Sequence, residues 1–133
     1  MDTTTFEKYQ AELEEELDLT DFNIKDVQMK LPGIKHKWVA RLIQQKIELN
    51  KFKKLKLDAI DTLITTLRRE NSILYSDAVL AKQAEKHETV QKINEKIEEC
   101  ELLIEYLEKI EKMCSSTSFD IKNIIDIKKM EMT

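Results

Sequence analysis

The stretch VQKINEKIEECELLIEYL, residues 90–107, has the clearest structural pattern in the chain. Its apolar residues recur at alternating intervals of three and four, which is the spacing of one face of an α-helix. The same spacing forms the seam of a left-handed helix pair, so this segment is expected to pack lengthwise against a second long helix. The seam consists of Val90, Ile93, Ile97, Cys100, Ile104 and Leu107.

The partner helix is predicted upstream, over residues 33–70. Its apolar stripe begins at Ile34 and Trp38 and continues at helical spacing. Pro32-Gly33 is expected to start this helix, because proline is favoured in a first helical turn and biases the preceding residue away from helix.

Short polar segments predict where the other helices begin and end. Asn71-Ser72 and Ser76-Asp77 precede an acidic long helix, which either serine is suited to cap. The Ser115–Ser118 run is expected to end that helix. The first helix should fray beyond Leu17, because Glu14, Glu15 and Glu16 lie where the helix dipole disfavours acids. We predict an acidic N-terminal helix 1–29, a basic long helix 33–70, an acidic long helix 77–114 and a C-terminal oligomerisation helix 118–131.

The predicted fold class is therefore all-α. It is an elongated helical hairpin of two long helices plus short N- and C-terminal helices, and residues 1–133 form a single domain. Charged residues make up 36% of the chain and there is one glycine and one proline, a composition typical of long helices.

Composition also excludes several classes of function. Glycine-rich phosphate loops need several glycines, and Gly33 stands alone. No apolar run approaches the ~18 residues of a membrane span, and the first residues do not resemble a secretion signal, so an intracellular protein without membrane attachment is expected. Cys100 and Cys114 lack a companion cysteine or histidine pair, and neither His36 nor His87 has metal-site spacing. We predict no metal, no cofactor and no enzymatic activity.

The charge is strongly segregated along the chain. Residues 30–69 contain eleven bases and three acids, a net charge of +8, although the whole chain has −4. This basic block either packs beside the acidic segments or binds a polyanion. The two are compatible if some bases neutralise neighbouring acids while others stay free. No duplex-reading motif is present, so a flexible single strand is the favoured polyanion. The candidate nucleic-acid-binding residues are Lys37, Arg41, Lys46, Lys51, Lys53, Lys54, Lys56, Arg68 and Arg69.

Two apolar surfaces predict self-association. A patch on the basic helix lies well round the cylinder from its main stripe, and the C-terminal helix has few polar sides. In a monomer both would be exposed, and exposed apolar patches mark partner surfaces. The candidate oligomerisation residues are Val39, Ile43, Ile47, Ile121, Ile124, Ile125 and Ile127.

Two stretches resemble a known family. The run IEYLEKIEKMCSSTSFDIKNIIDIKKME, Ile104–Glu131, resembles the end of the UvsY-type recombination mediators of tailed, T4-like bacteriophages. The stretch KLPGIKHKW and the following KKLKL resemble their middle region. Together these stretches cover roughly half of the chain.

The resemblance implies a non-enzymatic ring of six or seven subunits in the cytoplasm of the infected host cell. Its implied partners are single-stranded DNA, the phage recombinase and the phage single-strand-binding protein, and its role is to help load the recombinase onto covered strands. It implies oligomerisation through the C-terminal isoleucines and DNA contacts from Lys46, Lys51, Lys53, Lys54 and Lys56. One departure is DAIDTLITT, residues 58–66, where Ala59 stands near an expected cation and the family's tyrosines are missing; Arg68-Arg69 could compensate.

The predicted function is thus a phage recombination mediator. A coiled-coil scaffold or adaptor that binds only proteins is the main alternative, and a helical chaperone is a further one. Retention of a single-stranded oligonucleotide at low salt would distinguish the mediator from the scaffold and the chaperone.

Overall fold

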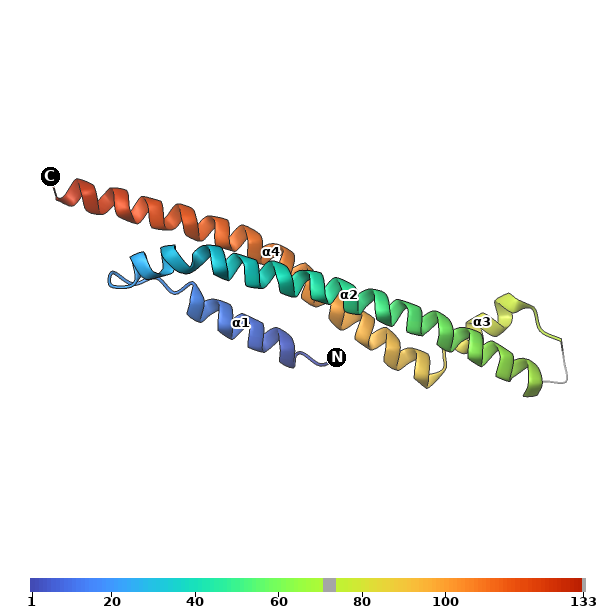
Figure 1. The fold of residues 1–133 in the computed structure, drawn as a ribbon. Helices are drawn as coiled ribbons and strands as arrows, with labels where there is room; N and C mark the ends of the chain where they lie inside the picture. The colour runs from blue at the N-terminus through green and yellow to red at the C-terminus, as the bar shows by residue number, and fades with distance from the viewer. Residues whose placement is uncertain (71–73, 133) are drawn as a thin grey trace. The chain divides into compact units, whose positions relative to one another are not determined.

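The protein was studied as a computed structural model, which describes residues 1–70 and 74–132. Its regular structure over these residues is entirely α-helical, which confirms the predicted fold class. Figure 1 shows the four helices of this part of the chain: α1 Thr4–Glu16, α2 Ile24–Glu70, α3 Asp77–Glu85 and α4 Glu88–Glu131. None of the helices in the described ranges is long and apolar enough to cross a membrane.

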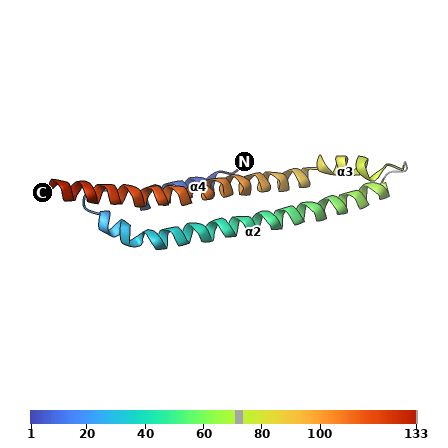
Figure 2. The ribbon, with the colours of Figure 1, turned by 90° about the horizontal axis from the view of Figure 1, so that it is seen from above.

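The helices contribute to two compact units. The α1 unit contains Asp2–Gln44 and Leu103–Thr133, and the α3 unit contains Gln45–Leu102 together with Met1. α2 and α4 each supply a segment to both units, and within each unit these two segments run antiparallel (Figures 1 and 2). The predicted pairing of two long helices is therefore confirmed.

The core of the α1 unit has two apolar clusters. Trp38 of α2 is 2% exposed and lies in the first cluster with Leu13 of α1 and Leu107 of α4. Ile24 and Val27 of α2 pack in the second cluster against Ile121 of α4. α1 thus shares a core with both long helices. The Phe6 ring of α1 also contacts the Tyr106 ring of α4 edge-on, with 4.9 Å between the ring centroids.

The predicted start of α2 at residue 33 is wrong. The helix begins at Ile24 and contains Pro32, although a proline removes one backbone hydrogen bond. Ile24, Val27 and Leu31 are all buried, with Leu31 5% exposed. Burial of each such side chain contributes about 1.5–3 kcal/mol, so the three together outweigh a proline cost of about 3 kcal/mol.

The predicted break at residues 115–118 is also wrong. α4 continues through these residues to Glu131, so the expected C-terminal helix is the last part of α4. Thr117 donates from Oγ1 to the carbonyl of Met113 at 3.0 Å, and Ser118 donates to the carbonyl of Cys114 at 3.2 Å. Because these hydroxyls bond one turn back along the helix, the polar run does not interrupt it.

The break that does occur in the predicted 77–114 helix lies between Glu85 and Glu88. His87 accepts a hydrogen bond at Nδ1 from the backbone N–H of Thr89, 3.1 Å away, which caps the start of α4. The expected cap at Ser76 is confirmed, since its hydroxyl accepts from the backbone N–H of Val79 at 3.3 Å. Asn71 and Ser72 lie outside the described residues.

The predicted N-terminal helix 1–29 is right only in part, because residues 24–29 belong to α2. α1 ends at Glu16, with Leu17 as its C-cap, as expected from the acids of its last turn. Residues 18–23 connect it to α2 without a helix. The expectation that residues 1–133 form one domain stays a prediction.

Candidate nucleic-acid interface

The two most N-terminal candidate cations lie against acidic residues of α1. Lys37 Nζ is 2.8 Å from Oε1 of Glu12 and 2.5 Å from Oε1 of Glu16. Arg41 donates hydrogen bonds to the same Glu12 carboxylate from two nitrogens, Nη1 at 2.5 Å and Nη2 at 3.3 Å. The acids of α1 therefore neutralise this part of the basic helix, which is one of the two outcomes that the charge pattern left open.

Aromatic rings enclose the Arg41 guanidinium. Its carbon Cζ is 4.6 Å from the centroid of the Trp38 ring and 4.9 Å from that of Tyr9, within the range of cation–π attraction. The Tyr9 and Trp38 rings contact each other edge-on at 5.4 Å. The Trp38 Nε1 is buried and has no hydrogen-bond partner among residues 1–70 and 74–132, and an unpaired buried donor costs about 1–3 kcal/mol.

The titration of Glu12 reflects these contacts. Hydrogen bonds from Arg41 and Lys37 lower the pKa of the Glu12 carboxyl from 4.5 to about 2. Burial by itself would lower the pKa of Lys37, but its hydrogen bonds to Glu12 and Glu16 outweigh burial and raise it. Both changes favour the charged pair, so these groups remain ionised at neutral pH.

In the α3 unit, acids of α3 contact two further candidates. Lys56 Nζ is 3.5 Å from Oε1 of Glu85, and Arg68 pairs with Asp77. Lys51 lies 3.5 Å from Glu48 one turn earlier in α2, and its side chain is 69% exposed. The pair involving Lys51 is therefore a surface pair of little energetic weight.

Three candidates are left accessible. Lys53, Lys54 and Arg69 are exposed and form no ion pair with residues 1–70 or 74–132. Lys46 is exposed as well, and its seven-residue spacing from Lys53 places both on the same side of α2. The accessible part of the predicted site is centred on Lys53 and Lys54.

The candidate oligomerisation residues fall into two groups. Val39, Ile43 and Ile47 are 45%, 53% and 51% exposed, as expected for an unpartnered patch. In contrast, Ile121 is only 1% exposed, so the expectation that it is exposed in the monomer is wrong. Ile121 packs against Ile24 and Val27, whose helix begins earlier than predicted.

The other C-terminal isoleucines differ in their exposure. Ile124 and Ile125 are half-buried against the same cluster, and Ile127 is 55% exposed. Whether any of these residues forms a contact between subunits stays a prediction.

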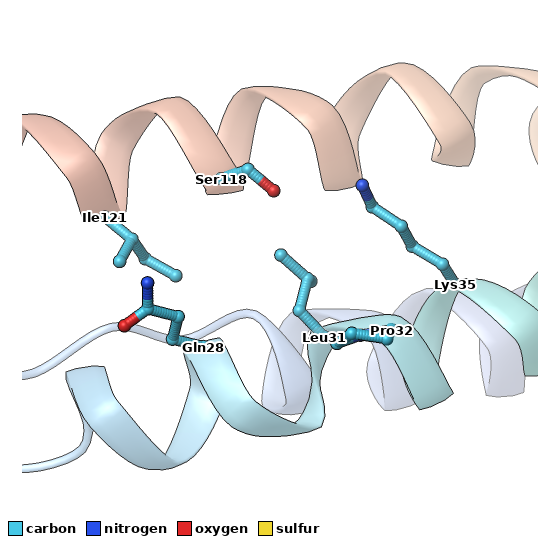
Figure 3. Close-up of a pocket in the computed structure, with 6 residues that line it drawn as sticks. All are labelled: Gln28, Leu31, Pro32, Lys35, Ser118 and Ile121. Carbon is cyan, nitrogen blue, oxygen red and sulfur yellow. The ribbon is translucent and has the colours of Figure 1, made fainter.

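A hollow of about 330 Å³ lies between α2 and α4 in the α1 unit. Figure 3 shows Leu31 pointing from α2 towards α4 and Lys35 extending its amine in the same direction. Among the described residues that line the hollow, Lys35 is the charged one. The rest of the lining is Gln28, Pro32, Ser118 and Ile121.

The cysteines and histidines do not form a metal site in the described residues, where no group of three metal-ligating side chains comes together. Cys100 and Cys114 are buried free thiols, and Cys114 packs in the first apolar cluster with Trp38 and Leu107. Burial raises the pKa of both thiols, which makes them less reactive.

Comparison with known proteins gives one informative result. No protein-family model matches the sequence, and no curated protein matches it significantly. The structure is similar to the crystal structure of UvsY, the recombination mediator protein of bacteriophage T4, with a TM-score of 0.79. The match covers 94% of this chain and 97% of that one, at 18% sequence identity.

The chain has the fold of UvsY. The resemblance to UvsY-type mediators, inferred from Ile104–Glu131 and KLPGIKHKW, is thus supported by a structural match over nearly the whole chain. At this identity the likeness to UvsY shows the fold alone, and the roles of individual residues must be argued from this structure.

Sequence reasoning missed the acidic partners of the basic helix. It placed Lys37, Arg41, Lys56 and Arg68 in the candidate site without assigning the acids that contact them. The available signal was the net charge of −7 over residues 1–29, which indicates neutralisation but does not specify which bases are neutralised. That depends on how α1 and α3 pack.

Proposed function

We propose that this chain is a recombination mediator of a tailed phage, acting in the cytoplasm of the infected host cell. It binds single-stranded DNA and promotes loading of the phage recombinase onto strands covered by the single-strand-binding protein. It does so as a homo-oligomer, a hexamer or heptamer, which presents the same cations repeatedly along the strand.

The observation that carries this proposal is the exposure of Lys53 and Lys54 in a chain with the UvsY fold. Both lysines lie on α2 without an ion pair in the described residues. Free lysines release counterions from phosphates, which gives affinity without sequence preference. One subunit offers few such contacts and binds weakly, so assembly supplies the avidity.

The test is the salt dependence of binding to a labelled single-stranded oligonucleotide. In the Lys53→Ala/Lys54→Ala variant, the slope of log affinity against log salt should fall by about 1.4 for each subunit engaged, since each phosphate contact contributes about 0.7. The matched control is Lys122→Ala/Lys129→Ala, which removes the same charge from exposed positions of α4. Equal slopes in both variants would exclude Lys53 and Lys54 from the site.

The mediator role is tested in the same variants. The wild-type chain should shorten the lag before the recombinase forms filaments on strands coated with single-strand-binding protein. The Lys53→Ala/Lys54→Ala variant should restore much of that lag, whereas the control should not.

The exposed patch formed by Val39, Ile43 and Ile47 favours the second candidate, a scaffold that binds only proteins. That function predicts no retention of the oligonucleotide even at low salt. Absence of binding by the wild-type chain would therefore replace the first proposal with this one.

A further inference from the structure

The contact between α1 and α2 has the composition of an occupied anion site. The Glu12 carboxylate is held by two Arg41 nitrogens and by Lys37, and Lys37 also holds Glu16. A fork of guanidinium nitrogens with a nearby ammonium is also how proteins bind phosphate oxygens. The position of the Glu12 carboxylate therefore suits one phosphate of a nucleic-acid backbone.

An aromatic surface lies beside this anion site. Trp38 contacts both the Arg41 guanidinium and Tyr9 of α1, and it shares a buried cluster with Leu13 of α1. Indole faces stack well on unpaired bases. The indole N–H of Trp38 has no acceptor in the part of the chain that the structure describes, so a conformation that provides one would remove the cost of an unpaired buried donor.

The helix that covers this surface is weakly held. α1 has 13 residues, a length at which an isolated helix is marginal, and Leu13 is its one buried residue. At its start, Asp2 accepts a hydrogen bond from the backbone N–H of Thr4 at 2.9 Å. Its last turn, in contrast, contains acids but no base, so the helix dipole disfavours the charges at its C-terminal end. Packing and the ion pairs with Lys37 and Arg41 therefore provide most of what holds α1 in place.

We propose that α1 masks a second single-stranded DNA site, in which Lys37 and Arg41 bind phosphate and Trp38 stacks on a base after α1 is displaced. This inference rests on the proposed binding of single-stranded DNA and adds its regulation. Glu12 and Glu16 occupy the cations in the free chain, so α1 and the strand exclude each other. A strand that binds here must therefore compete with Glu12 and Glu16 for Lys37 and Arg41.

The single tryptophan of the chain makes this testable without a mutation. Because Trp38 is 2% exposed, acrylamide should quench its fluorescence poorly in the free protein. A saturating single-stranded oligonucleotide should then change its emission, either by base stacking or by opening access to acrylamide. Unchanged emission and quenching at saturation would overturn the proposal while leaving the proposed function intact.

A charge-matched pair of variants provides the second test. Glu12→Gln/Glu16→Gln removes the two acids that hold the cations. Glu14→Gln/Glu15→Gln removes the same charge from exposed neighbours that form no ion pair in the described part of the chain. Competition predicts that the first variant binds the oligonucleotide about three- to tenfold more tightly than the second, a gain of up to about 1.4 kcal/mol.

The outcomes separate the two proposals. Equal affinity of both variants would show that only long-range charge matters and would remove the masking role of α1. Absence of binding by the wild-type chain and by both variants would overturn the proposed function together with this inference.

Discussion

Replacing Glu12 by Gln should destabilise the protein in a strongly pH-dependent manner. The substitution preserves the shape of the side chain but removes the charge that Lys37 and Arg41 share. Arg41 is then left against Tyr9 and Trp38 without its carboxylate, and Lys37 retains only Glu16. The loss in the free energy of unfolding should therefore appear at neutral pH.

The magnitude follows from the titration of Glu12. Its pKa of about 2 in the folded chain, against an ordinary 4.5, corresponds to about 3.4 kcal/mol for a fully enclosed group. Because 37% of the side chain is exposed, solvent screens the interaction, and we expect about 1 kcal/mol. The folded-state pKa is depressed, so this stability is present above pH 4.5 and is lost as the pH falls towards 2.

Urea unfolding followed by Trp38 fluorescence measures the effect, because this buried tryptophan reports on the core that α1 shares. The difference between wild type and Glu12→Gln should be about 1 kcal/mol at pH 7, and less than half of it should remain at pH 3. Glu15→Gln, an exposed neighbour, is the control and should change stability by less than about 0.5 kcal/mol. A difference that is absent at pH 7, or that is the same at pH 7 and pH 3, would refute this account of the ion pairs.

Three further outcomes are expected. Gly33→Ala should raise the free energy of unfolding by about 0.5–1 kcal/mol in the same urea assay, because Gly33 lies inside α2 and an added Cβ meets no atom within 4 Å; destabilisation would contradict a straight helical path there. Cys100 and Cys114 should react with a thiol reagent only in urea, since both are buried; rapid labelling of the native protein would show that the core opens. Ile43→Asp/Ile47→Asp should lower the sedimentation coefficient without loss of helical circular dichroism, because both side chains are about half exposed; an unchanged coefficient would exclude them from the subunit interface.

The helical character of the chain could be read from local patterns, but the helix boundaries near residues 33, 86 and 115 could not. The alternation at residues 90–107 specifies a helical face whatever surrounds it. Pro32 and the Ser115–Ser118 run are ordinary signals of a helix boundary, yet both lie inside helices. The burial of Leu31 in a tertiary core is not visible in a local window, whereas the bond from Thr117 to Met113 is local and offsets the polar run within the helix itself.

The candidate site was predictable as a region but not as a set of residues. The net charge of +8 over residues 30–69 correctly indicated an unusual basic helix. The pairing of individual cations depended on acids distant in the sequence. Arg41 pairs with Glu12, which lies 29 positions earlier, and Lys56 pairs with Glu85, which lies far beyond it. The composition gives the number of acidic and basic side chains but does not specify which of them form ion pairs.

The amino-acid sequence alone thus determined the all-α class, the two long amphipathic helices and the basic stretch, because helical periodicity and charge are properties of neighbouring residues. Only the tertiary structure decided that α2 runs through Pro32 and that Ile121 is buried. It also decided that, among the residues described, Lys37 and Arg41 form ion pairs whereas Lys53 and Lys54 form none. Burial and ion pairing act over a few ångströms, and such distances between remote residues exist only after the helices have packed.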